Sequence, residues 1–172
     1  MGNVSSTFQI RPARTSDVPA IKALVAPLAE ERILIAKESV AYYEALQEFR
    51  VAVTEDGTVI GCGALHIMWE DLGEIRTLAT DSAWRGRGVG HQLVTRLLKD
   101  AVEIGVSRLF CLTFEVDFFQ KHGFEVMAVQ SGVDPAVYSE LLRSHDEGVA
   151  EFLDLARVKP NTLGNTRMIR AL

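Results

Sequence analysis

The sequence is poor in cysteine and has no long apolar run. Its 172 residues include two cysteines, Cys62 and Cys111, which lie in strand-like segments without CxxC spacing or flanking histidines. This pattern predicts buried free thiols, no metal site and a reducing compartment, the cytoplasm. No segment approaches the roughly 20 apolar residues that span a bilayer, and the amino terminus lacks a secretion signal. We therefore expect neither a membrane span nor export.

Positive charge is also scarce. The net charge of -5 argues against nucleic acid as a partner, because non-specific binding to phosphate polymers needs a surplus of Lys and Arg. Any basic site must therefore be local. The hydrophobic share of 48% and charged share of 24% are ordinary for a globular protein. The length suits one well-buried core, so we expect a single domain over residues 1–172.

Apolar periodicity, caps and turn residues predict the order of elements. Strands are expected at 7–14, at 50–69 as a hairpin around Asp56-Gly57, and at 73–80, 107–114, 124–129 and 166–172. Helices are expected at 15–33, ended or kinked by Pro27, and at 39–49, 89–102, 116–122 and 134–144. The fold class is therefore α/β (α+β), with one mixed, mostly antiparallel sheet of about six to seven strands and helices on both faces.

The stretch that begins at Trp84, "WRGRGVGHQ", is dense in glycine and arginine just before an amphipathic helix. A helix N-terminus leaves backbone N–H groups without partners and carries partial positive charge, so it accepts an anion. Glycines allow a phosphate to approach, and Arg85 and Arg87 add formal charge, which suits a pyrophosphate. A surface turn with solvated arginines is the alternative.

Two phosphate motifs do not fit this stretch. It lacks the Gly-Lys-Ser/Thr of a P-loop, and His91 occupies a glycine position of the dinucleotide fingerprint. It resembles instead the pyrophosphate loop of the acyl-CoA-dependent N-acyltransferases, the GNAT superfamily, with the pattern Gln/Arg-x-x-Gly-x-Gly/Ala over Arg85–Gly90. The later "FFQKHGF" is similar to the family's Phe-Tyr-x-x-x-Gly-Phe. The resemblance covers about residues 7 to 130, and it implies the GNAT fold.

The resemblance implies acetyl-CoA as cosubstrate. In that family the pantetheine arm bonds to the strand before the loop, which implies main-chain contacts at Leu78, Ala79 and Thr80. The residues expected at the pyrophosphate are Arg85, Gly86, Arg87, Gly88, Val89, Gly90 and His91. For His91, a polar position at an exposed helix start is an equal alternative.

Strand alternation places four residues of "GEIRTLAT" on one face: Glu74, Arg76, Leu78 and Thr80. A carboxylate and a guanidinium thus share a strand that borders the expected cleft. Glu74 is the candidate for proton removal, directly or through water, and Arg76 for binding a substrate carboxylate. An ordinary ion pair of small energetic value is the alternative.

The whole chain resembles the stand-alone N-acetylglutamate synthases of actinobacterial type. The segments that carry this likeness are "DLGEIRTLA", "LTFEVDFFQKHGF", "SHDEGVAEFLDLARVKPNTLGN" and "NTRMIRAL". The likeness implies transfer of acetyl from acetyl-CoA to the α-amine of L-glutamate, the first step of arginine biosynthesis. Burying a substrate carboxylate unpaired is expensive, so cations are needed. The expected substrate-binding set is Arg76, Lys159, Asn161, Asn165 and Arg167. Solvated surface charge is the alternative for Lys159 and Arg167.

The expected mechanism uses Glu74 as the base and the backbone N–H of Leu78 as the oxyanion donor. Phe119 stands where the family usually has a tyrosine acid, and phenylalanine cannot donate a proton. The general acid must then be Thr113 or a water, or the reaction proceeds without one. An acid is not obligatory, because a thiol can leave without full protonation. His122, beside Gly123, is expected to be part of a helix end.

Other functions remain open at this point. The chain could acetylate glutamine, a polyamine, an antibiotic or a protein N-terminus, or it could be an acyl-CoA-binding module without catalysis. Many members of the superfamily pair, so the resemblance allows a homodimer. The sequence shows no room for the amino-acid-kinase-like domain that longer synthases carry.

Overall fold

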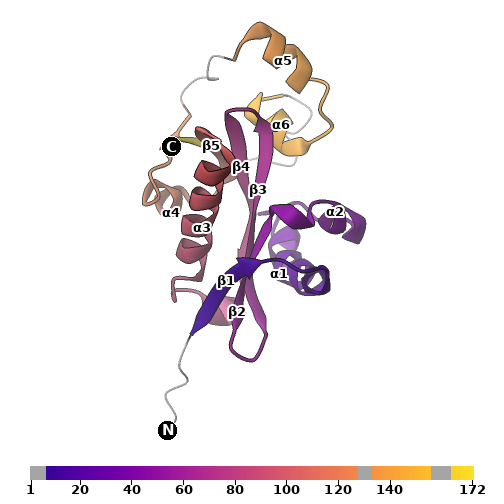
Figure 1. Ribbon diagram of the computed structural model, residues 1–172, viewed down its shortest axis with the longest axis vertical. Helices are drawn as coiled ribbons and strands as arrows, with labels where there is room; N and C mark the ends of the chain where they lie inside the picture. Colours follow the sequence, from indigo (N-terminus) through magenta and orange to yellow (C-terminus); the bar gives the residue numbers. More distant parts are fainter. Residues whose placement is uncertain (1–6, 128–132, 156–163) are drawn as a thin grey trace. The chain divides into compact units, whose positions relative to one another are not determined.

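The computed structural model describes residues 7–127, 133–155 and 164–172 (Figure 1). Its strands are β1 (Phe8–Pro12), β2 (Phe49–Thr54), β3 (Val59–Trp69), β4 (Leu72–Thr80), β5 (Arg108–Thr113), β6 (Glu125–Val126) and β7 (Thr166–Ala171). Its α-helices are α1 (Val18–Glu30), α2 (Ser39–Glu44), α3 (Val89–Ile104), α4 (Val116–Gln120), α5 (Pro135–Leu141) and α6 (Glu147–Phe152). Short 3-10 turns are η1 (Thr15–Asp17), η2 (Leu46–Glu48) and η3 (Ser82–Trp84).

The described strands form one seven-stranded sheet in the order β1-β2-β3-β4-β5-β7-β6. The pairs β1·β2, β2·β3, β5·β7 and β6·β7 are antiparallel, whereas β4 and β5 run parallel. The parallel pairing runs from Leu72 opposite Arg108 to Glu74 opposite Phe110. The prediction of a mixed, mostly antiparallel sheet with helices is confirmed.

The residues group into two compact units. The first comprises residues 1–65 and 77–100, and the second comprises residues 66–76 and 101–172. Strands β3 and β4 and helix α3 each continue from one unit into the other.

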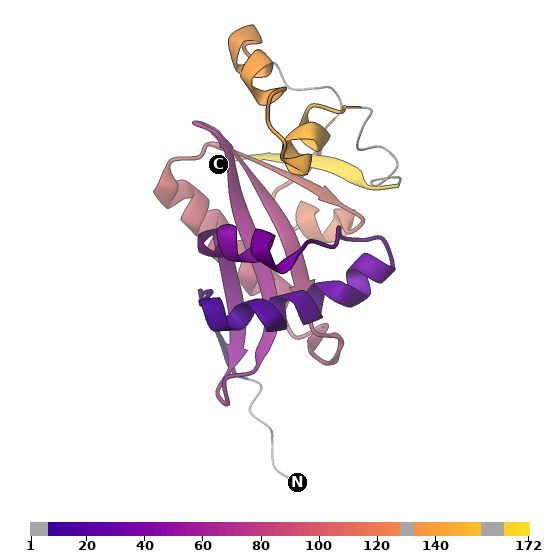
Figure 2. The ribbon, with the colours of Figure 1, turned by 90° about the vertical axis from the view of Figure 1, so that its right-hand side faces the viewer.

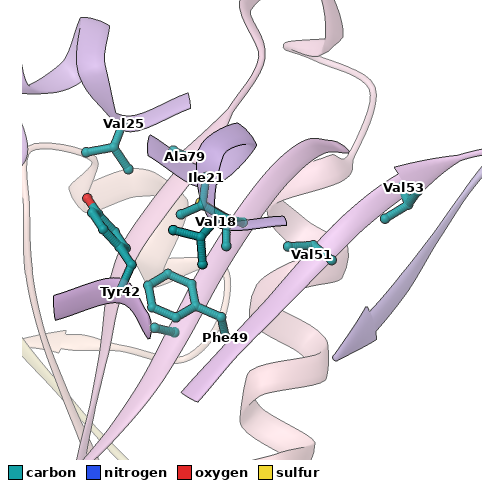
Figure 3. Packing of buried hydrophobic residues seen from close by; sticks show 10 residues of the cluster. Val18, Ile21, Val25, Tyr42, Phe49, Val51, Val53 and Ala79 are labelled. Carbon is teal, nitrogen blue, oxygen red and sulfur yellow. The ribbon is translucent and has the colours of Figure 1, made fainter. Parts of the chain in front are cut away.

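The core of the first unit lies on both faces of β2. Val51 and Val53 pack with side chains of α1 and α2, whereas Ala52 packs with Val89 and Leu93 of α3. Successive residues of a strand point to opposite faces, so helices cover both faces here. Figure 2 shows α1 and α2 lying across one face of these strands, and Figure 3 shows the side chains that fill the contact.

Two glycines of β3 let α3 approach the sheet closely. A Cβ built at Gly61 would lie 2.7 Å from Val89 Cγ1 and 3.1 Å from Leu93 Cδ1. A Cβ built at Gly63 would lie 3.0 Å from Leu97 Cδ1. The helix therefore packs against bare backbone, which fixes the position of its N-terminus within the unit.

The core of the second unit joins β4 and β5 to the C-terminal helices. Leu72 and Phe110 pack with Leu141 of α5 and with Val149 and Phe152 of α6. The Phe110 and Phe152 rings meet edge to face with centroids 5.6 Å apart. These apolar contacts hold α6 against the strands that carry the candidate site residues.

Several boundaries differ from the predicted ones. Strand β4 begins at Leu72, one residue before the predicted start at 73, and the turn before it lies at Glu70 and Asp71. Helix α1 continues one turn past Pro27. Helix α6 was not predicted, because six residues that include Gly148 give no helical period.

The predicted alternation of β4 fails at Thr77. This residue has a φ of +55°, a left-handed conformation that interrupts a strand as a bulge does. Leu78 packs in the cluster of α3, and Ala79 packs in the cluster of α1 and α2. The left-handed conformation of Thr77 therefore interrupts the two-residue alternation between Arg76 and Leu78.

Cys62 and Cys111 are both buried and both free, as predicted. Burial raises the pKa of the Cys62 thiol to about 12, so that it stays protonated at neutral pH. In the part of the chain that the structure describes, every helix is too short or too polar to cross a bilayer.

The close approach at Gly61 generates a stability prediction. Gly61→Ala adds a methyl group that overlaps Val89 and Leu93, and we expect it to lower the free energy of unfolding by about 1–3 kcal/mol. Gly57→Asn is the control, because Gly57 lies in an open turn with a φ of +87° that asparagine tolerates. Urea unfolding followed by circular dichroism measures both. Equal stability of Gly61→Ala and the wild-type protein would contradict the tight packing.

Candidate active site

Glu74 and Arg76 lie together on β4, in the second unit. Glu74 is 6% exposed, and Arg76 Nε lies 3.4 Å from Glu74 Oε2. The side chain of Arg76 is 13% exposed. The predicted pairing of a carboxylate with a guanidinium on this strand is therefore present, and burial makes it more than a solvated surface pair.

Asp146 adds a second carboxylate to this pair. Its Oδ2 accepts a hydrogen bond from Arg76 Nη1 at 2.9 Å and lies 3.5 Å from His66 Nε2. Burial raises the pKa of Asp146, but the positive charges of Arg76 and His66 outweigh burial and hold this pKa below its usual value. At neutral pH the cluster thus contains an ionised Asp146. The sequence analysis did not identify either Asp146 or His66.

The first turn of α6 lies directly against Glu74. A Cβ built at Gly148 would overlap Glu74 Oε2, so only glycine fits beside the carboxylate. Asp146 Oδ1 caps the same helix by accepting from Val149 N at 3.1 Å. The segment "SHDEGVAEF", which carries the likeness to the stand-alone synthases, therefore supplies groups that surround the candidate base.

The glycine loop follows β4 in the sequence, after the short 3-10 turn η3. Asp81 Oδ1 accepts from Ala83 N at 2.8 Å and starts η3, after which the chain passes through Gly86 and Gly88 with φ values of +76° and +81°. No heavy atom lies within 4 Å of a Cβ built at either glycine. The loop therefore combines a left-handed backbone with open space beside it.

Helix α3 begins at Val89, inside the glycines, as predicted. The bond from Gln92 N to Gly88 O, at 3.0 Å, is in the i to i-4 pattern of its first turn. Before the helix, the amides of Arg85 and Arg87 donate to Ser82 O and Trp84 O, each at 3.4 Å. Arg85, Arg87 and His91 are exposed, and the Arg87 guanidinium lies 4.9 Å from the Trp84 ring centroid. The amides, the partial charge of the helix and two arginines form a local basic site on an acidic protein.

The general-acid candidates lie in the second unit. Thr113 is 8% exposed at the end of β5, and its Oγ1 accepts from Glu115 N at 2.7 Å. Phe119 is buried between Phe118 and Phe124, with ring centroids 5.1 and 5.3 Å away. Phe119 is thus a core residue. The His122 and Phe118 rings are tilted by 51° with centroids 5.3 Å apart. His122 precedes the left-handed Gly123, just after the end of α4.

The predicted substrate-binding residues have different surroundings. Arg167 donates from Nε to Glu151 O at 2.9 Å and from Nη2 to Phe152 O, which caps the last carbonyls of α6. Asn165 is half-buried, and its Oδ1 has no hydrogen-bond partner among the described residues. Lys159 and Asn161 lie outside the described residues.

Within residues 7–127, 133–155 and 164–172, no three His, Cys, Asp or Glu side chains gather to hold a metal ion. The chemistry of the described cluster is that of a base and ion pairs. A buried carboxylate on β4 can accept a proton, and the loop at the end of the same strand can bind an anion.

Comparisons with known proteins agree with this arrangement. The model of the acetyltransferase (GNAT) family matches residues 21–124. An amino-acid acetyltransferase from Mycobacterium tuberculosis is 54% identical over 165 residues, which are 95% of this chain and 94% of that protein. An amino-acid acetyltransferase from Neisseria meningitidis is 36% identical over 118 residues, and the match spans only 27% of that longer protein.

Two solved structures extend the comparison. The crystal structure of Rv2747 from Mycobacterium tuberculosis, in complex with CoA and NLQ, has a TM-score of 0.90 at 54% identity. The match covers 95% of this chain and 99% of the Rv2747 chain. An N-acetylglutamate synthase from Neisseria gonorrhoeae, complexed with coenzyme A and N-acetyl-glutamate, has a TM-score of 0.77 at 26% identity. The match covers 98% of this chain and 36% of the synthase chain. The fold is the GNAT fold, and the chain belongs to the acetyltransferase (GNAT) family.

Proposed function

We propose that this chain is an amino-acid N-acetyltransferase that transfers the acetyl group of acetyl-CoA to the α-amine of L-glutamate, the first step of arginine biosynthesis. The observation that carries the proposal is strand β4, which holds the buried Glu74 carboxylate and is followed, after the short turn η3, by the loop at 85–90. The Mycobacterium relative is an amino-acid acetyltransferase, and the Neisseria gonorrhoeae structure is an N-acetylglutamate synthase. A cytoplasmic location and a homodimer belong to the same proposal.

The glycine loop fits the diphosphate of acetyl-CoA. Space beside Gly86 and Gly88 would allow an anion to reach the backbone, and the amides from Arg85 to Gly90 would supply donors. Those of Arg85 and Arg87 would exchange their 3.4 Å bonds to Ser82 O and Trp84 O for the anion. His91, at the exposed start of α3, would add a polar contact. The backbone groups of Leu78, Ala79 and Thr80 would bond to the pantetheine arm as to an added strand.

Glu74 would act as the base. Bound acetyl-CoA supplies an activated acyl group whose leaving group is a thiol. Because an amine attacks only as the free base, Glu74 would accept its proton directly or through water. The Leu78 N–H would stabilise the negative charge that develops on the carbonyl oxygen. Thr113 would donate a proton to the departing sulfur, a step that a thiol leaving group does not require.

Substrate carboxylates would require more positive charge than Arg76 alone. Two carboxylates, Glu74 and Asp146, already contact its guanidinium. Lys159 and Arg167 would therefore contribute positive charge, and the Asn161 and Asn165 side chains would complete the hydrogen bonds. Arg167 would do so while it caps α6, because a guanidinium carries five N–H donors.

The substrate class is tested by a free-thiol assay with acetyl-CoA and a panel of acceptors. We expect glutamate to be turned over with the highest kcat/KM, glutamine to be a weaker acceptor and spermidine to give no turnover above background. The reason is that the proposed cations recognise a second carboxylate. Turnover of polyamines alone, or of no amine despite CoA binding, would contradict the proposal.

The role of Glu74 is tested by Glu74→Gln, which keeps the shape of the side chain and removes its basicity. We expect kcat to fall by about 10²–10⁴-fold with a small change in the KM for acetyl-CoA. Glu70→Gln is the matched control, because Glu70 is an exposed carboxylate in the turn before the same strand. Unchanged kcat in Glu74→Gln would remove Glu74 from the mechanism.

The anion site is tested by Arg87→Ala. We expect the KM for acetyl-CoA to rise about tenfold, because a charge-assisted contact to the diphosphate is lost. S-Acetylpantetheine lacks the diphosphate, so its turnover should be the same in the variant and the wild type. Lys121→Ala, an exposed cation at the end of α4, serves as the charge control. If Arg87→Ala lowered turnover with acetyl-CoA and with S-acetylpantetheine equally, Arg87 would have another role.

A further inference from the structure

Asp146 is contacted by basic side chains from two strands. Arg76 of β4 donates to its Oδ2 at 2.9 Å, and His66 Nε2 of β3 lies 3.5 Å from the same oxygen. The side chains of Arg76, Asp146 and His66 are 13%, 22% and 24% exposed. This oxygen is thus a shared acceptor in a partly desolvated place, where charge pairs are worth more than in water.

The other contacts of Asp146 hold its carboxylate in place. Oδ1 accepts from Val149 N at 3.1 Å, and the backbone N–H of Asp146 donates to Ser144 Oγ at 3.1 Å. One oxygen therefore fixes the residue to the start of α6, and the other is left to face the two strands. An anchor built in this way holds its partner more firmly than a carboxylate on a free side chain.

Arg76 needs such an anchor if it is to bind a substrate. An arginine side chain loses up to ~2 kcal/mol of rotamer freedom when it is ordered, and this cost is removed from substrate binding if a neighbour orders it beforehand. The Nη1 atom is held by Asp146, and Nε lies near Glu74. Both contacts come from side chains of the protein itself.

We infer that Asp146 is a positioning residue, which holds the Arg76 guanidinium in the orientation that receives the acceptor's carboxylate. The inference rests on the proposed function and deepens it, because it names what prepares the substrate site. His66 is the second partner of Asp146, with Nε2 3.5 Å from the same oxygen that accepts from Arg76. Asp146 itself touches neither the acceptor nor acetyl-CoA.

The surroundings of His66 are consistent with a supporting role. Its ring lines a pocket of about 350 Å³ together with Glu140, Arg143 and Ser144. Its Nε2 lies 3.5 Å from Asp146 Oδ2, within ion-pair distance. We therefore expect substitution of His66 to have a smaller effect than substitution of Asp146.

Asp146→Ser is the variant that separates positioning from helix capping. Serine is a good N-cap, so α6 keeps its cap while Arg76 loses its anchor. Asp134→Ser is the matched control, since Asp134 caps α5 through Ala136 N at 2.8 Å. Thermal unfolding of both variants establishes that each one folds.

We expect Asp146→Ser to raise the KM for glutamate about tenfold, with kcat and the KM for acetyl-CoA within about threefold of wild type. In a double-mutant cycle with Arg76→Gln, the added effect of Asp146→Ser should disappear, because no guanidinium remains to position. His66→Asn should raise the same KM about threefold. Asp134→Ser should match the wild type.

Two results would overturn the inference. One is a KM for glutamate in Asp146→Ser equal to that in Asp134→Ser. The other is a full effect of Asp146→Ser in the Arg76→Gln background, which would make Asp146 a structural residue. Failure of the proposed function is recognised separately, because the wild-type protein would then bind CoA without acetylating glutamate.

Discussion

The structure depends on one feature, a helix N-terminus that opens inside glycines at the end of a strand. Helix α3 starts at Val89, where Gly86 and Gly88 have left-handed backbones and no side chains. The preceding amides carry the partial positive charge of the helix. A protein of net charge -5 can therefore bind a diphosphate without a general attraction to polyanions.

The chemistry depends on a second constraint, the contact of α6 with β4. Gly148 leaves room for the Glu74 carboxylate, and Asp146 contacts the guanidinium of Arg76. Packing of Phe152 on Phe110 holds this short helix in place. The proposed base and the proposed carboxylate-binding group thus contact a helix that lies beyond residues 21–124, the part of the chain that the family model matches.

The sheet, the helix order and the loop could be predicted because they rest on local signals. The Asp56-Gly57 turn, the period of α3 and the Gly86–Gly90 stretch each act over a few residues. The bulge at Thr77 could not be predicted, because threonine rarely adopts a positive φ and only the folded strand imposes it. The two-residue alternation that the sequence predicts is therefore interrupted between Arg76 and Leu78.

The candidate site was only half visible in the sequence for a similar reason. Glu74 and Arg76 are neighbours on one strand, so their pairing follows from spacing. Asp146 lies 70 residues beyond Arg76, and nothing in its local sequence indicates the contact. Arg167 was predicted to bind the substrate or to be a solvated surface charge, and its contact with the last carbonyls of α6 was not predicted. Contacts between residues so far apart in the sequence can be identified only from the folded structure.

The most direct test of the account is an NMR titration of ¹⁵N-labelled protein with CoA. The backbone amide signals of residues 85–91 should shift together and saturate. Pantetheine, which lacks the diphosphate, should leave these signals unchanged. Shifts confined to other parts of the chain, or no shifts at millimolar CoA, would contradict the claim that this helix start binds the coenzyme.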